Sequence, residues 1–128
     1  MMGWLWDRKP PREEFRIGQA ERLAEWFRIA AARGRPRGLE WVSYAEVGEV
    51  VWAKAGGSWL ALVPLVVRFE SVPGGAMEDV PQAREPRAIV AVFRQVGRGW
   101  IPDARAFFNL TPTQLIERSG GSWVPAAP

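Results

Sequence analysis

Few side chains in this sequence could perform acid–base or nucleophilic chemistry. The chain contains no histidine and no cysteine, so the commonest general base, the commonest transition-metal ligand and every thiolate site are missing. Carboxylates and a single tyrosine remain. A carboxylate buried among apolar walls can act as an acid or a base when its pKa is raised. If the protein is an enzyme, a cofactor-free hydrolase, isomerase or cyclase, we expect Asp103, Glu70 and Tyr44 to carry the reaction.

Asp103 stands out because Arg105 follows it at a spacing of two. In an extended strand both side chains point to the same face, where Asp103 could pair with Arg105 or, across a hairpin, with Arg94. Acidic pairs without an organising motif, such as Glu78-Asp79, are mostly surface residues. No acidic spacing resembles a calcium loop, and no glycine run resembles a phosphate loop. The sequence therefore favours a protein without catalytic residues, metal or cofactor.

Tryptophans are the second group of side chains that could have a function, and the chain contains eight of them in 128 residues. Aromatic rings on the open face of a curved sheet can form a pocket for an apolar or sugar-like ligand, or a surface for a partner. Filling the core of a small domain is the alternative, and the sequence favours it. The residues predicted for a ligand or partner surface are Trp4, Trp6, Trp41, Trp52, Trp59, Trp100 and Met77.

Arginines cluster at Arg33, Arg35 and Arg37. Clustered guanidinium groups can hold phosphates, and neighbouring aromatic rings would suit single-stranded nucleic acid. No nucleic-acid-binding motif surrounds the cluster, however, and arginine near a helix C-terminus interacts favourably with the helix dipole. The net charge is only +3, and the excess lies in residues 1–38. We therefore favour a solvated helix end over a nucleic-acid site.

Residues 1–12 are predicted to form an N-terminal arm in which Trp4, Leu5 and Trp6 precede basic residues and a double proline. The arm resembles a short interfacial anchor, but it buries too little area to hold a membrane alone. Packing on the body or on a neighbouring subunit is the alternative. No apolar run approaches the roughly 20 residues that cross a bilayer, and no signal peptide is visible, so we expect a cytoplasmic protein.

The elements that must position these residues begin with a helix over residues 13–33, which Gly34 and Pro36 end. Its predicted apolar face has helical spacing and consists of Ala20, Leu23, Ala24, Phe27, Ala30 and Ala31, with Trp26 and Ile29 outside the stripe. From residue 39 the apolar period changes to two. This period predicts strands over residues 39–47, 49–55, 58–70, 87–96 and 100–110.

Turn residues separate these strands. Gly56-Gly57 and Gly97-Arg98-Gly99 predict hairpins, and residues 71–86 a long loop. The strand over residues 58–70 is apolar on both faces, so we expect cover on both sides, whereas Pro64 indicates an edge or a bulge. Residues 111–114 fit a capping box that opens a short helix through Arg118. Residues 124–128 are expected to be a frayed tail.

Together these elements predict an α+β fold with one domain over residues 13–123. An N-terminal helix packs on a curved antiparallel meander of four to five strands, followed by a short C-terminal helix. The order of elements resembles that of a cystatin-like roll. For function, we predict a non-catalytic binding or protein-interaction module, such as an accessory subunit of a larger assembly. Its expected partner is a protein or a second copy, contacted through the arm and the 71–86 loop, with a small apolar ligand as an alternative. A small enzyme is the second hypothesis and a weak nucleic-acid binder the third.

Overall fold

The computed structural model describes residues 9–34 and 38–126. The helical elements are α2 (Arg12–Arg16), α3 (Gln19–Gly34), the 3₁₀ turn η2 (Pro81–Arg84) and α4 (Pro112–Arg118). The strands are β1 (Leu39–Glu46), β2 (Val51–Ala55), β3 (Ser58–Ser71), β4 (Arg87–Val96), β5 (Gly99–Pro102), β6 (Phe107–Phe108) and β7 (Val124–Pro125). Among the described helices, none is long and apolar enough to cross a membrane.

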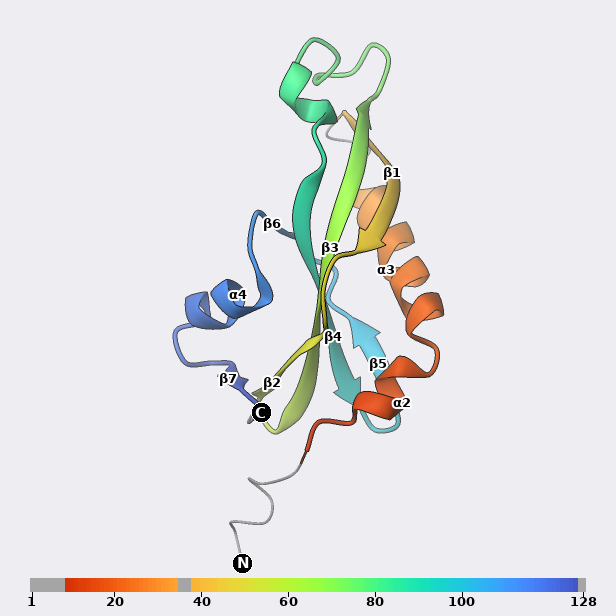
Figure 1. The fold of residues 1–128 in the computed structure, drawn as a ribbon. Coiled ribbons are helices and arrows are strands. Elements are labelled where there is room, and N and C mark those ends of the chain that lie inside the picture. Colours follow the sequence, from red (N-terminus) through yellow and green to blue (C-terminus); the bar gives the residue numbers. More distant parts are fainter. Residues whose placement is uncertain (1–8, 35–37, 127–128) are drawn as a thin grey trace, which may run out of the picture.

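All seven strands join one antiparallel sheet that lies between two helical layers. Figure 1 shows α2 and α3 against one face and α4 against the other. β3 is the central strand: β4 pairs along one side of it, and β1 and β2 share the other side. The predicted α+β class is confirmed, whereas the resemblance to a cystatin-like roll stays a prediction.

The N-terminal helical segment differs from the single helix predicted over residues 13–33. Ile17 is extended and Gly18 has a φ of +79°, so the chain turns between α2 and α3. The Arg22 side chain donates hydrogen bonds to the carbonyl oxygens of Phe15 (2.7 Å) and Ile17 (2.8 Å). These bonds satisfy carbonyl groups at the end of α2 that have no intrahelical partner.

The buried face of α3 is also rotated from the predicted one. Leu23, Trp26 and Ala30 are buried, and Ala20 and Ala24 are exposed. Trp26, expected outside the apolar stripe, is only 1% exposed. The large indole buries more apolar area than two alanines, so the helix turns this side to the sheet.

Pro64 lies in the central strand β3, at a place where residues 47–50 of the neighbouring segment lie opposite only residues 63 and 64, so the predicted irregularity is present. β1 ends at Glu46 and β2 begins at Val51, so the neighbour on one side of β3 is interrupted beside Pro64. The Val47 N–H donates to the Pro64 carbonyl oxygen (3.1 Å) on that side. Because the nitrogen and carbonyl of a strand residue point to the same neighbour, the missing N–H of proline faces the interruption.

The strand predicted over residues 100–110 is two short strands with a bulge between them. Pro102 of β5 pairs with Phe93, and Phe107 of β6 pairs with Val90. Four residues, 103–106, therefore lie opposite only two residues of β4. At the C-terminal end, Val124 and Pro125 pair with β2 instead of fraying. These differences explain why the sheet has seven strands and not four to five.

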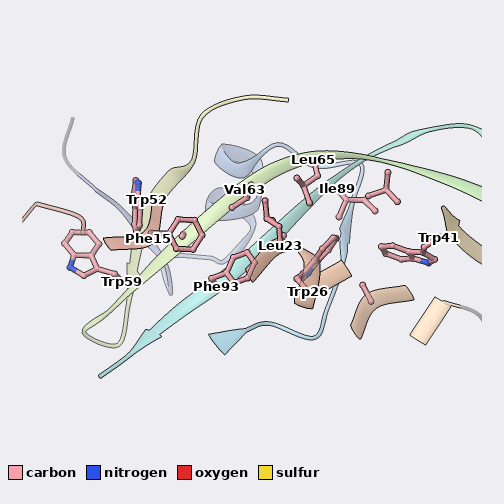
Figure 2. Close-up of a cluster of buried hydrophobic side chains, with 14 of the residues drawn as sticks. Phe15, Leu23, Trp26, Trp41, Trp52, Trp59, Val63, Leu65, Ile89 and Phe93 are labelled. Atoms are coloured by element: carbon pink, nitrogen blue, oxygen red, sulfur yellow. The ribbon is translucent and has the colours of Figure 1, made fainter. Parts of the chain in front are cut away.

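Each face of the sheet carries its own apolar core. On the face covered by α2 and α3, the side chains of Phe15, Leu23 and Trp26 pack against strand residues (Figure 2). On the other side, Leu115 and Ile116 of α4 pack on a smaller cluster that includes Leu60 and Leu62. The predicted cover on both sides of β3 is confirmed. Within the described residues, no polar or charged side chain is buried.

Local signals predicted several elements correctly. Gly56 and Gly57 both have positive φ and join β2 to β3, as a tight hairpin requires. The bounds of β4 match the predicted strand. The Thr111 hydroxyl accepts from the Gln114 N–H (3.1 Å), and the Gln114 amide oxygen accepts from the Thr111 N–H (2.9 Å), so the capping box is formed. The 71–86 loop contains η2.

Candidate functional site

The face of the sheet that α2 and α3 cover is filled by side chains rather than open. Trp41, Trp52 and Trp59 are buried there, and the half-buried Trp100 packs on Phe15 with ring centroids 4.9 Å apart. The predicted Trp4 and Trp6 lie outside the described residues, and Met77 is half-buried in the loop after β3. Most of the described tryptophans therefore contribute to the core, and a functional surface must be sought where a ring borders a hollow.

The three residues that we expected in an enzyme do not share a site. Glu70 is exposed on β3, and Tyr44 of β1 is half-buried with its ring 4.8 Å from that of Phe27. Asp103 lies in the 103–106 bulge at the other edge of the sheet, beyond β4. No pair among them is in contact, so none can relay a proton to another.

Asp103 and Arg105 pair through the bulge instead of through strand alternation. Asp103 Oδ1 accepts from the Arg105 backbone N–H (2.9 Å) and Nε (3.0 Å), and Oδ2 accepts from Nη2 (2.7 Å). Partial burial acts to raise the pKa of the Asp103 carboxyl, but the hydrogen bonds and charge of Arg105, with the charge of Arg94, outweigh burial and lower the pKa. The carboxyl therefore stays ionised and is unsuited to act as a general acid.

Replacing Asp103 with asparagine is expected to lower the free energy of unfolding at pH 7 by no more than about 1 kcal/mol, because the Arg105 side chain is 64% exposed and solvent screens the pair. A carboxyl whose pKa is lowered by folding stabilises above its unfolded pKa of about 3.9 and loses this effect as pH falls through the folded value. The difference between wild type and variant should therefore shrink below about pH 4. Urea unfolding between pH 2.5 and 7 measures it.

Asp79→Asn is the control for this experiment, because Asp79 is an exposed carboxylate in the 71–86 loop. A loss in Asp79→Asn as large as in Asp103→Asn, or a difference that grows in acid, would contradict the role of the pair.

A crevice lies where the bulge approaches the C-terminal end of α3. We call it the Trp41 crevice. Its volume is about 230 Å³, and it is lined by Ala30 and Arg33 of α3, Leu39 and Trp41 of β1, residues 104–106 of the bulge and Phe108 of β6. Three segments far apart in the sequence thus build one hollow. No Asp or Glu within the described residues lines it.

Aromatic rings form one wall of the Trp41 crevice. The Trp41 ring meets Phe69 at a centroid distance of 5.0 Å and Phe108 at 5.9 Å. The Phe69 and Phe108 rings are stacked, with centroids 6.1 Å apart. Trp41 and Phe108 come from strands separated by β3 and β4 in the sheet. Their rings therefore reach toward each other across the face that α3 covers. Phe108 remains 37% exposed, which leaves apolar surface for a ligand.

Arg33 connects the two sides of the crevice. Its Nη1 donates a hydrogen bond of 2.8 Å to the carbonyl oxygen of Ala104, which holds the end of α3 against the bulge. A guanidinium group has five N–H donors, and no second acceptor for Arg33 is present among the residues that the structure describes. Arg33 belongs to the predicted arginine cluster; Arg35 and Arg37 lie outside the described residues.

Trp41 also carries an unsatisfied donor. Its residue is only 8% exposed, and its buried Nε1–H has no hydrogen-bond partner among the described parts of the chain. An unpaired buried donor costs about 1–3 kcal/mol relative to a paired one. Trp26 has the same property, but it lies inside the core, whereas Trp41 also borders the crevice.

A second hollow lies on the opposite face, between β6 and α4. It is lined by Arg105, Phe107, Leu110, Leu115, Arg118, Ser119, Ser122 and Trp123. The Arg105 guanidinium carbon stands 4.9 Å from the centre of the Phe107 ring, a cation–π arrangement. Arg105 borders both hollows because the bulge forms the rim of the sheet between them.

Sequence reasoning singled out Trp41 and Arg33 but missed Leu39, Phe108 and the bulge that brings them together. Pro102-Asp103 is the signal that could have located the bulge, because proline and aspartate favour turns over strand interiors. Phe108 carried no local signal, since its role depends on the return of the chain after the bulge.

Comparison of the chain with protein-family models, curated proteins and solved structures finds no match. In the part of the chain that the structure describes, no group of three acidic, histidine or cysteine side chains is placed to hold a metal ion. The function must therefore be inferred from the geometry of this chain alone.

Proposed function

We propose that this protein is a non-catalytic binding module and that the Trp41 crevice is its ligand site. One observation carries the proposal: a hollow with an aromatic wall, bordered by two guanidinium groups, at a place where α3, β1 and the bulge converge. Binding sites in proteins are typically concave and mostly apolar, with a few polar groups that orient the ligand.

The size of the crevice restricts its ligand. Pockets for drug-sized molecules occupy about 300–1,000 Å³, and this one occupies about 230 Å³. A ligand with one or two rings, or one side chain of a partner, is of suitable size. The dispersion of Asp103, Glu70 and Tyr44 over separate places supports binding without catalysis.

The proposal also includes a cytoplasmic location and a role as an accessory subunit that binds a protein partner. For that part the sequence offers the N-terminal arm and the 71–86 loop as contact segments. The crevice is the part of the proposal that the geometry supports, and it can be tested without knowing the partner.

Filling the crevice should abolish binding of a small aromatic probe. Ala106 lines the hollow and is half-buried, so Ala106→Phe would place a ring inside it. We expect 2-naphthalenemethanol to shift the Nε1–H resonance of Trp41, assigned by Trp41→Phe, in ¹H–¹⁵N spectra of the wild type. In Ala106→Phe, we expect affinity to fall by about tenfold or more.

Ala45→Phe is the matched control, because it adds the same ring at an exposed position of β1 that does not line the crevice. Equal binding to wild type and Ala106→Phe, or shifts confined to other tryptophans, would refute the site. Should Ala106→Phe not fold, Phe108→Ala removes part of the wall at a partly exposed position and is expected to weaken binding.

A further inference from the structure

We infer that the ligand of the Trp41 crevice is a small organic acid: an apolar body on the aromatic wall and a carboxylate held by Arg33. This inference rests on the proposed function, and it adds the charge and chemical class of the ligand. It follows from which charges border the crevice and which of them are already paired.

The charges that border the crevice are positive. Arg33 and Arg105 are its only ionisable lining residues among those described. Arg105 is neutralised by Asp103 through two side-chain hydrogen bonds of 3.0 and 2.7 Å. Arg33 has a neutral carbonyl as its hydrogen-bond acceptor, and no ion pair of Arg33 occurs within the described residues. Among residues 9–34 and 38–126, Arg33 is therefore the positive charge of the crevice that no carboxylate neutralises.

The Arg33 guanidinium is also held in place before a ligand arrives. The 2.8 Å bond from Nη1 to the Ala104 oxygen restrains the end of the side chain. Less side-chain entropy is then lost when the remaining N–H groups bind an anion. A planar guanidinium matches a carboxylate through two parallel hydrogen bonds, which a single ammonium charge cannot reproduce.

One effect opposes an anion here, because Arg33 lies in the last turn of α3 and the C-terminal end of a helix is negative. At exposed positions that effect is weaker than a hydrogen bond to a charged group. The attraction by Arg33 is the larger of the two.

The test compares 2-naphthoate with 2-naphthalenemethanol, which share one ring system and differ in charge. Dissociation constants are measured from the Trp41 Nε1–H shift for wild type, Arg33→Gln and Arg28→Gln. Arg28→Gln is the matched control, because it removes the same charge from an exposed position of α3 that does not line the crevice.

We expect the acid to bind the wild type about tenfold more tightly than the alcohol. Arg33→Gln should remove this preference, and Arg28→Gln should keep it within twofold. Similar affinities for both probes would overturn the organic-acid inference and leave the binding site intact. Equal losses in the two variants would overturn it as well, because the attraction would then be a general charge effect. No shift with either probe would refute the proposed function itself.

A further arm distinguishes a free acid from the end of a partner chain. A tripeptide that ends in phenylalanine with a free carboxylate presents the same two groups. If this peptide binds more tightly than 2-naphthoate and loses its affinity on C-terminal amidation, the site belongs to a protein partner and the small-acid inference is wrong.

Discussion

Replacing Trp26 with alanine is expected to lower the free energy of unfolding by about 3–5 kcal/mol. Trp26 is 1% exposed in the core between α3 and the sheet, and its ring packs against Trp41 with centroids 6.0 Å apart. Truncation would leave a cavity that the packed sheet cannot close, in addition to the lost burial of the indole. Urea unfolding followed by far-ultraviolet circular dichroism measures the loss.

Two variants make this prediction specific. Trp123→Ala removes the same side chain from a half-buried position on the other face, beside Phe107, and should cost about 1–2 kcal/mol. Trp26→Phe keeps most of the ring and removes the unpaired Nε1–H, so a cost of about 1 kcal/mol is expected. Equal losses in Trp26→Ala and Trp123→Ala would show that Trp26 is not a core residue.

Gly38→Ala is expected to cost about 2–3 kcal/mol and is the second large effect. Gly38 is buried in the turn immediately before β1 and has a φ of +83°, where an L side chain is strained. A Cβ would lie 3.1 Å from the backbone nitrogens of Ala76 and Met77. The Gly38 carbonyl also accepts from the Val72 N–H (3.0 Å), so this glycine joins the loop after β3 to the strand that carries Trp41.

Gly57→Ala separates the two causes of this loss. Gly57 has the same φ of +83°, but nothing lies within 4 Å of the position of its Cβ. Strain alone should therefore cost about 1 kcal/mol in Gly57→Ala, and the excess in Gly38→Ala reports the contact with the loop. Thermal and urea unfolding of both variants measure the difference. If the two variants lose equal stability, the close approach of residues 76–77 to Gly38 is wrong.

Predictions based on the spacing of apolar residues located β1 to β4, but they missed the break in the last strand and misplaced the buried face of the helix. β4 matches its predicted range because its central side chains, residues 89–93, alternate between two covered sides of the sheet and are all buried. In α3, an apolar stripe through the alanines and one through Trp26 are both compatible with helical spacing. Only the area buried against the sheet decides between them.

The binding crevice could be predicted only in part. Trp41 and Arg33 were both singled out by residue type, but as members of separate groups. The hollow that they border depends on the bulge at residues 103–106, where the Ala104 carbonyl accepts from Arg33, and on Phe108, whose ring lies beside Trp41. No spacing along the chain encodes a contact between residues 71 positions apart.

The sequence by itself determined what is decided within a few residues: the Gly56-Gly57 hairpin, the capping box at Thr111 and the absence of imidazole and thiol chemistry. Backbone torsions and neighbouring side chains are sufficient for these features, because the interactions involved close within a turn. The tertiary structure decided which face of α3 is buried, where the last predicted strand breaks and which arginine faces an aromatic wall. These outcomes depend on burial and pairing between distant segments, where several local patterns compete and packing selects one.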